Sequence, residues 1–207
     1  DEPASEVFNS QWDSLDIMSE TEETDSQEND NPIAITMEEL VNARFRGENI
    51  LAKPEEVDLL ICATSNPDYR FPSTGSIIAG GCGFKNAYAY DIQAACAGFI
   101  VALQAATAYI RSGMYKKVIV VATEKMSSMV NYSDRTTCPL FGDAAAAVLV
   151  EPTNDANVGV IDGVFRVETH IEHLLMKAGG SVKPASHESV DAGEHFVYQD
   201  GRNVYKH

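Results

Sequence analysis

Cys96 is the residue of this chain whose type and position best suit covalent chemistry. It lies in a segment of small residues, Ala94-Ala95-Cys96-Ala97-Gly98. A β-favouring segment over 87–92 precedes it, and an Ala-rich segment typical of a helix follows over 99–111. This pattern predicts a cysteine at a helix N-terminus, where unpaired N–H groups and the helix dipole favour a thiolate. A thiolate there suits nucleophilic attack on an electrophilic carbonyl.

The ordinary alternative is that Cys96 is a small core residue, as free cysteines often are. On chemistry alone, both interpretations of Cys96 stay open. Cys62 follows the apolar run Leu-Leu-Ile and is predicted to be core, while Cys82 and Cys138 lie in loop-like segments. These spacings contain no CxxC pair, no zinc pattern and no dense disulfide framework, which is typical of a reducing, cytoplasmic setting.

The acidity of the chain is concentrated at its beginning. The formal net charge is −16, but residues 1–40 contain thirteen Asp or Glu and no Lys or Arg. The other 167 residues are nearly balanced, so no basic stripe for nucleic acid is expected. The sequence has neither a run of eighteen apolar residues nor an N-terminal signal segment. We therefore expect a soluble protein without a membrane partner.

The order of the predicted elements indicates a layered α/β fold with a mixed sheet between helices. Residues 1–33 are acidic and polar, and we expect them to be disordered. A helix is predicted from Thr36, and a shorter one over 76–79. Strand patterns occur at 57–64, 87–92, 117–122 and 144–150, with weaker ones at 158–164 and 196–198. Beyond Pro152 the pattern weakens, and the chain looks cut at residue 207.

Several motifs in order over 54–207 resemble the β-ketoacyl-acyl-carrier-protein synthase III family, whose members are thiolase-fold condensing enzymes. The resemblance rests on segments around the cysteine and on both sides of it. They are Ala-Thr-Ser-Asn-Pro-Asp-Tyr-Arg-Phe-Pro-Ser-Thr at 63–74, Asp-Ile-Gln-Ala-Ala-Cys-Ala-Gly-Phe at 91–99, Thr-Glu-Lys-Met-Ser at 123–127, Tyr-Ser-Asp-Arg-Thr-Thr at 132–137, Phe-Gly-Asp at 141–143 and Gln-Asp-Gly-Arg-Asn-Val-Tyr-Lys at 199–206. By this resemblance residues 34–151 form the N-terminal half of a thiolase-like fold, and residues 152–207 form connecting loops and the start of its second half.

The resemblance implies an acyltransferase of fatty-acid initiation. Cys96 matches the family nucleophile, which takes an acyl group from a short acyl-CoA such as acetyl-CoA and condenses it with malonyl-acyl-carrier-protein. Phe71 matches a residue that closes the partner's acyl pocket in a homodimer, and Phe141 matches a wall of that pocket. Arg135 and Arg202 match positions near CoA, although an ion pair with Asp134 is the ordinary alternative for Arg135. No cofactor is implied, because acyl-CoA is a substrate.

The sequence also departs from the family pattern. The family's catalytic histidine and asparagine, and its opening strand, have no counterpart in these 207 residues, and Ala144 replaces a usual glycine. His170 and His173 have a spacing that could suggest a metal site, but no third ligand accompanies them. Two other interpretations therefore stay open. One is another thiolase-superfamily condensing enzyme, and the other is a non-catalytic, truncated paralogue that acts as a binding or structural partner.

Overall fold

The computed structural model describes residues 52–206, apart from 156 and 168–170. Contacts divide the chain into two units, 1–34 and 35–207, and every described residue belongs to the second unit. The acidic segment 1–33 and the helix predicted from Thr36 lie outside the described residues. The domain boundaries proposed above therefore stay predictions.

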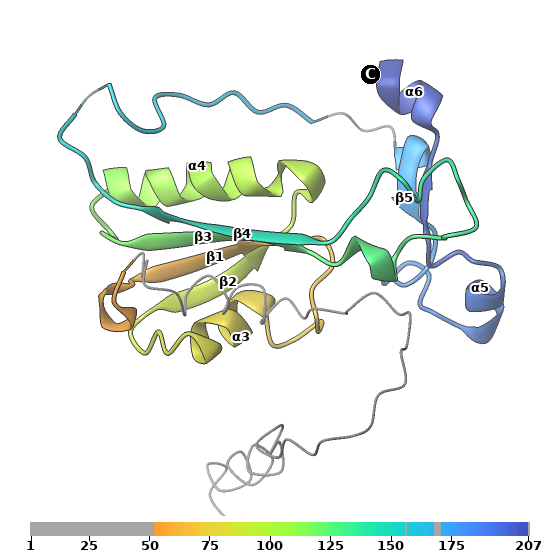
Figure 1. The fold of residues 1–207 in the computed structure, drawn as a ribbon, viewed down its shortest axis with the longest axis horizontal. Helices are drawn as coiled ribbons and strands as arrows, with labels where there is room; N and C mark the ends of the chain where they lie inside the picture. The colour runs from red at the N-terminus through yellow and green to blue at the C-terminus, as the bar shows by residue number, and fades with distance from the viewer. Residues whose placement is uncertain (1–51, 156, 168–170, 207) are drawn as a thin grey trace, which may run out of the picture. The chain divides into compact units, whose positions relative to one another are not determined.

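A four-stranded mixed sheet forms the centre of the described fold (Figure 1). Its strands are β1 (Leu59–Ala63), β2 (Tyr88–Ile92), β3 (Val118–Glu124) and β4 (Ala144–Val150). The strand order is β2-β1-β3-β4, with β1 parallel to both of its neighbours and β4 antiparallel to β3. The predicted strands over 57–64, 87–92, 117–122 and 144–150 are confirmed within a few residues.

The central strand β1 is buried on both faces because helices cover the sheet from both sides. Successive side chains of a strand point to opposite faces, so Leu60 and Cys62 pack with Ile78 of α3 (Thr74–Gly81). Leu59 and Ile61 pack instead toward α4 (Gly98–Arg111). Figure 1 shows α3 and α4 on opposite sides of the sheet. Burying each large aliphatic side chain contributes roughly 1.5–3 kcal/mol, which explains the continuous apolar run of β1.

Local capping interactions set the ends of the two helices. Ser73 caps α3 by accepting a hydrogen bond from the Ser76 amide. Asp91 of β2 accepts two more, from the amides of Thr74 at 2.8 Å and Gly75 at 2.7 Å. These bonds fasten the start of α3 to the strand that leads toward Cys96.

Helix α4 ends as the sequence predicts. Its last residue is Arg111, and Ser112 is the C-cap. Gly113 then takes a φ of +74°, a left-handed conformation that costs glycine little.

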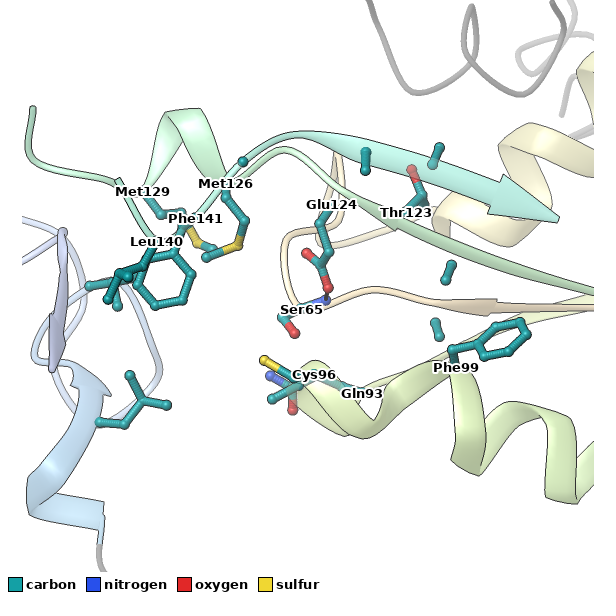
Figure 2. A pocket seen from close by; sticks show the side chains of 18 of the residues that line it. Ser65, Gln93, Cys96, Phe99, Thr123, Glu124, Met126, Met129, Leu140 and Phe141 are labelled. Carbon is teal, nitrogen blue, oxygen red and sulfur yellow. Dashed lines mark hydrogen bonds between the residues drawn. The ribbon is translucent and has the colours of Figure 1, made fainter. Parts of the chain in front are cut away.

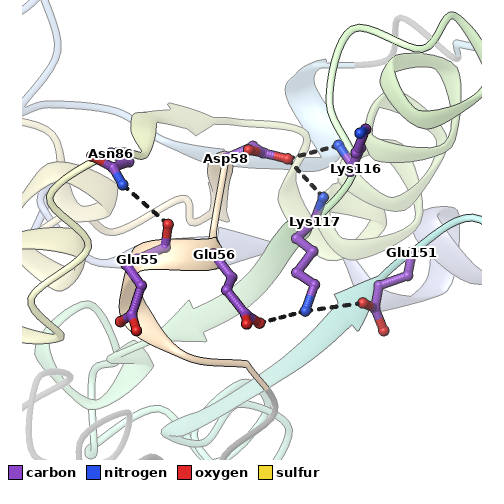
Figure 3. Close-up of polar contacts among 7 residues, drawn as sticks. All are labelled: Glu55, Glu56, Asp58, Asn86, Lys116, Lys117 and Glu151. Atoms are coloured by element: carbon purple, nitrogen blue, oxygen red, sulfur yellow. Dashed lines mark hydrogen bonds and ion pairs between the residues drawn. The ribbon is translucent and has the colours of Figure 1, made fainter.

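A polar network joins the strands at the end of the sheet where β1 and β3 begin and β4 finishes (Figure 3). Asp58 Oδ2 accepts hydrogen bonds from the amides of Lys116 at 2.7 Å and Lys117 at 2.9 Å. The Lys117 ammonium lies 2.6 Å from Glu56 Oε2 and 3.5 Å from Glu151 Oε1. The hydrogen bond between Lys117 and Glu56 lowers the pKa of the Glu56 carboxyl and raises the pKa of the Lys117 ammonium. Each of these charged groups therefore has a partner.

The C-terminal part of the described chain adds a two-stranded sheet and two short helices. Strand β5 (Leu174–Met176) pairs antiparallel with β6 (Val197–Gln199), which confirms the weak strand pattern at 196–198. The helices are α5 (His187–Asp191) and α6 (Gly201–Lys206), and neither they nor β5 were predicted. A hydrogen bond of 2.8 Å from the Val197 amide to the Met129 carbonyl joins this part to the loop after β3.

The strand predicted over 158–164 is wrong. The segment has no regular structure, and Val164 is 81% exposed. The reason lies in its backbone partners, since the Arg111 guanidinium donates to the carbonyls of Val160 and Ile161. No strand of the described chain pairs with the segment, so its apolar pattern finds no sheet to join. Among the described helices, none has the length and apolar character needed to cross a membrane.

Candidate active site around Cys96

The candidate site lies where the three parallel strands end. Strands β1, β2 and β3 run in the same direction, so the chain leaving each one starts from the same edge of the sheet. Ser65 follows β1, Gln93 and Cys96 follow β2, and Glu124 ends β3. This edge is where ligands bind in open α/β sheets. Figure 2 shows these side chains gathered around one cavity.

A sharp turn presents Cys96 to solvent. Ala95 has a φ of +47°, and among the described residues it is the one non-glycine with a positive φ. Such a backbone is costly for a residue with a Cβ, and such strain often occurs at functional sites. A 3-10 turn over Ala95–Ala97 then leads into α4, which begins at Gly98. The prediction of a cysteine at a helix start is confirmed, with the cysteine two residues before α4 itself.

The burial of the cysteines separates Cys96 from Cys62. Cys96 is exposed and unpaired, so it is not the small core residue that was the alternative. Cys62 is buried in the core, as predicted, and burial raises the pKa of its thiol. A nucleophile must reach its substrate, and Cys62 does not meet this condition.

Glycine at position 98 allows the helix start to approach the sheet closely. A Cβ at Gly98 would lie 3.2 Å from the Ala63 Cβ, which is tighter than an ordinary contact. The missing side chain therefore lets α4 begin directly against the end of β1. This close approach brings Cys96 beside Ser65 in the lining of one cavity.

The cavity has a volume of about 670 Å³ and largely apolar walls. Its polar lining side chains are Ser65, Gln93, Thr123 and Glu124, in addition to Cys96. The apolar wall comes from the sheet, from the start of α4, from the loop after β3 and from the small C-terminal sheet. It includes Phe99, Met126, Met129, Leu140, Phe141, Leu174, Leu175, Met176 and Val197. Phe141, predicted to be a pocket wall, thus lines the same cavity as Cys96.

Glu124 connects two of the strand ends. Its Oε1 accepts a hydrogen bond of 2.7 Å from the Ser65 amide. Its Oε2 is buried and has no hydrogen-bond partner among the described residues. The residue before Ser65 is also held, because the Thr64 amide donates to the Ile92 carbonyl at 3.2 Å. The segment after β1 is therefore held from both sides, by β3 and by β2.

The loop between β3 and β4 is held by Asp143. The Asp143 carboxylate accepts from the amide of Ser127 at 2.7 Å and from its hydroxyl at 2.6 Å. These bonds hold the 3-10 turn Met126–Ser128 against the segment that contains Phe141. Ala144, which replaces a usual glycine, is the first residue of β4 and has no positive φ, so the turn is not crowded there.

The remaining predicted site residues lie away from the cavity. Phe71 is 81% exposed, and Arg135 and Arg202 are also exposed, the latter on α6. Within the described chain Arg135 forms no ion pair. The neighbouring Asp134 accepts hydrogen bonds from the hydroxyls of Thr136 and Thr137 instead, which lower the pKa of its carboxyl.

The described residues contain no group of three His, Cys, Asp or Glu side chains placed to hold a metal ion. His173 lies 3.6 Å from Glu172. His170 falls outside the described residues.

Sequence reasoning assigned no role to Ser65, Gln93 or Glu124, although all three lie in or beside the quoted motifs. The available signal was their position directly after, or at the end of, a predicted parallel strand. Met126 and Met129 had no such signal. Their place in the wall depends on how the loop 125–143 folds back over the sheet.

The amino-acid sequence is similar to those of known condensing enzymes. Residues 90–168 match the family 3-Oxoacyl-[acyl-carrier-protein (ACP)] synthase III. The chain is 52% identical over 157 residues to beta-ketoacyl-[acyl-carrier-protein] synthase III 2 of Bacteroides thetaiotaomicron, covering 75% of this chain and 47% of that protein.

Solved structures show the same fold. The 3-oxoacyl-[acyl-carrier-protein] synthase III of Aquifex aeolicus superposes with a TM-score of 0.67 and 34% identity, over 86% of this chain and 52% of that one. A priming β-ketosynthase from the R1128 polyketide pathway gives a TM-score of 0.65 with 28% identity, over 83% of this chain and 51% of that one. The chain thus has a thiolase-like fold and spans about half the length of the relatives it matches.

Proposed function

We propose that the chain is a member of the β-ketoacyl-acyl-carrier-protein synthase III family, a proposal that its similarities support, and that it carries the acyl-accepting half of such an enzyme. In this proposal Cys96 takes an acyl group from a short acyl-CoA, with acetyl-CoA as the expected donor. The observation that carries the proposal is the exposed Cys96, which a strained turn presents to a mostly apolar cavity.

Acylation would proceed by addition and elimination at the thioester carbonyl. The Cys96 sulfur attacks the carbonyl carbon, and a new carbon–sulfur bond forms as the carbonyl oxygen becomes negatively charged. Backbone N–H groups, including that of Cys96, would stabilise this charge. The bond to the CoA sulfur then breaks, and the proton from the Cys96 thiol ends on the CoA thiol. Two thiolates of similar basicity exchange, so the step needs no oxidant or reductant.

We propose that the second half-reaction uses malonyl-acyl-carrier-protein. Loss of carbon dioxide gives an enolate whose carbon attacks the acyl group on Cys96, which leaves as a thiolate. The family's histidine and asparagine have no counterpart in these 207 residues. We therefore expect the 207-residue chain to be acylated but not to condense unless those groups are supplied by other polypeptide segments.

The exposed side chains of Phe71, Arg135 and Arg202 have proposed roles outside the cavity. The guanidinium groups of Arg135 and Arg202 are free to contact the phosphates and adenine of CoA, and this is their proposed role. The exposed Phe71 ring is proposed to contact a second copy of the chain in a homodimer. We also propose a cytoplasmic location, where the Cys96 thiol stays reduced.

The experiment is a labelling measurement on the full 207-residue chain. Incubation with acetyl-CoA followed by intact-mass analysis should show one added acetyl group, and Cys96→Ser should show none. Iodoacetamide at neutral pH should alkylate Cys96 at a rate that excess acetyl-CoA reduces. A folded chain that gains no acetyl group, and whose Cys96 resists iodoacetamide, would overturn the proposal.

A second candidate function is the priming of a polyketide pathway, which uses the same acyl-cysteine chemistry. The similarity to the R1128 priming β-ketosynthase favours it as the runner-up. Competition between acetyl-CoA and longer acyl-CoA donors for Cys96 separates the two. A preference for acetyl-CoA supports fatty-acid initiation, and a preference for the longer donors supports polyketide priming.

A further inference from the structure

Glu124 is the acidic group of the cavity, and the acylation steps above do not use it. It ends β3, lines the cavity together with Cys96, and has a buried Oε2 without a partner among the described residues. A buried carboxylate oxygen without a hydrogen bond lowers stability, because the group loses its water and gains nothing in return. The hydrogen bond from the Ser65 amide accounts for Oε1 of this carboxylate, whereas the described part of the fold leaves Oε2 without a use.

The hydrogen bond between Glu124 and Ser65 shows what the carboxylate does. Its Oε1 accepts the Ser65 amide at 2.7 Å, across 59 positions of sequence. Ser65 is the second residue after β1, where no ladder partner remains for its N–H group. Glu124 thus supplies the acceptor that the end of the strand lacks and determines where the Ser65 main chain lies.

Ser65 has a hydroxyl that the described part of the chain does not use. No hydrogen bond joins this hydroxyl to another described residue, and Ser65 lines the cavity. Figure 2 shows the Ser65 side chain between Glu124 and Cys96, with its oxygen directed toward the cysteine. The rest of the cavity wall is mostly apolar. The Ser65 hydroxyl is therefore one of the few polar groups available to an acyl group on Cys96.

We propose that Glu124 is a positioning residue, which holds Ser65 so that the Ser65 hydroxyl donates a hydrogen bond to the carbonyl oxygen of the acyl group at Cys96. This inference rests on the proposed function, because it needs an acyl thioester at that cysteine. Glu124 acts through the length of its side chain and through its acceptor oxygen, and its negative charge has no role. Ser65 makes a direct contact with the reacting group.

Three substitutions separate these roles. Glu124→Gln keeps the length of the side chain and an acceptor oxygen for the Ser65 amide, but removes the charge. Glu124→Asp keeps the charge but shortens the side chain by one methylene, so the carboxylate no longer reaches Ser65. Ser65→Ala keeps the backbone N–H bonded to Glu124 and removes the hydroxyl. Glu55→Gln is the matched control, because Glu55 is exposed at the opposite end of the sheet.

The first readout is the rate of Cys96 acetylation by saturating acetyl-CoA, followed by intact mass. Ser65→Ala and Glu124→Asp should each slow it by about tenfold or more, as expected for the loss of one donor to a developing oxyanion. The concentration of acetyl-CoA at half-saturation should stay within about threefold, since the nucleotide contacts are untouched. Glu124→Gln should stay within about threefold of the unmodified chain, and Glu55→Gln should not differ from it.

Two further readouts separate positioning from a general structural effect. Iodoacetamide carries no acyl thioester, so Ser65→Ala and Glu124→Asp should alkylate at the unmodified rate. Amide hydrogen exchange at Ser65 should quicken in Glu124→Asp and not in Glu124→Gln, while exchange within β1 stays slow in both.

The possible outcomes are distinct. An unchanged acetylation rate in Ser65→Ala overturns the contact with the acyl group. A loss in Glu124→Gln with an unchanged rate in Glu124→Asp overturns the positioning role and makes the charge the relevant property. If the unmodified chain is not acetylated at all, the proposed function fails and the Ser65 contact fails with it. Exchange at the Ser65 amide still decides in that case whether Glu124 positions the segment after β1.

Discussion

The two ends of the central sheet carry similar polar residues in opposite states. At the end where β1 and β3 begin, Asp58 accepts two amides, and Lys117 lies between the carboxylates of Glu56 and Glu151. At the end where these strands finish, the Cys96 thiol is exposed and one oxygen of Glu124 has no described partner. Polar groups that are fully paired hold strands together, whereas groups left unpaired beside a cavity are available to a ligand.

The hydrogen bonds of the Asp58 and Glu124 carboxylates illustrate this contrast. Each carboxylate accepts backbone N–H groups from residues next to a strand: Asp58 from the two residues before β3, and Glu124 from one residue after β1. Asp58 accepts two bonds, both through Oδ2. Glu124 makes one bond and leaves its other oxygen buried next to the cavity. Mutations at the two ends should therefore change different observables.

Cys96→Ala gives the largest expected effect. Acetylation of the chain by acetyl-CoA should be lost completely, because no other cysteine combines exposure with a place in the cavity wall. The free energy of unfolding should change by less than about 0.5 kcal/mol, since the side chain is at the surface. Intact mass and urea unfolding measure the two effects. A loss of several kcal/mol would show that the thiol is part of the core and would break the contrast.

Leu60→Ala tests the region between the two ends. Leu60 is fully buried in the cluster on the α3 side of the sheet, so its truncation leaves a cavity. The free energy of unfolding should fall by about 2–5 kcal/mol. Urea unfolding followed by far-UV circular dichroism measures it. Ile100→Ala on the exposed side of α4 is the control, and its effect should be several times smaller because the side chain is 59% exposed.

Asp58→Ala and Glu124→Ala sharpen the comparison directly. Asp58→Ala removes two charge-assisted hydrogen bonds to backbone N–H groups, and the free energy of unfolding should fall by about 1–3 kcal/mol. The rate of Cys96 acetylation should not change in Asp58→Ala and should fall in Glu124→Ala. If both variants slow acetylation equally, the two ends are not functionally distinct.

Lys117→Met gives the smallest expected effect, and that effect depends on pH. The Glu56 carboxyl has a lowered pKa, so its contribution to stability is present above its unfolded pKa of about 4.3 and is lost as pH falls through the folded value. The Lys117 ammonium has a raised pKa, so its contribution is present below its unfolded pKa of about 10.4 and is lost as pH rises through the folded value. The difference in Tm between Lys117→Met and the unmodified chain should therefore be greatest between these limits.

Salt provides the control for this last prediction. Because the pair is partly exposed, 1 M salt should screen it and reduce the difference in Tm. A difference in Tm that does not vary with either pH or salt would mean that Lys117 acts through packing of its aliphatic stem instead of through its charge.

The sequence by itself determined the layered α/β fold and the position of Cys96. Apolar runs such as 59–63 have the length and composition of buried strands, and glycine at position 113 ends a helix because of its own backbone freedom. The order of the motifs likewise indicates the resemblance to the synthase III family. These features are local along the chain, and local periodicity and turn chemistry report on them directly.

Only the tertiary structure decided which polar groups meet. Ser65 and Glu124 are 59 positions apart and become neighbours because β1 and β3 are parallel and adjacent. It also decided that 158–164 is not a strand, since an apolar pattern forms a strand only where a neighbouring edge accepts its backbone. Val197 of β6 and Met129 of the loop after β3 reach the same cavity through a contact that neither segment encodes alone. The place of Cys96 before a helix can be predicted from its neighbours in sequence, whereas the cavity around it exists only after strands distant in sequence have paired.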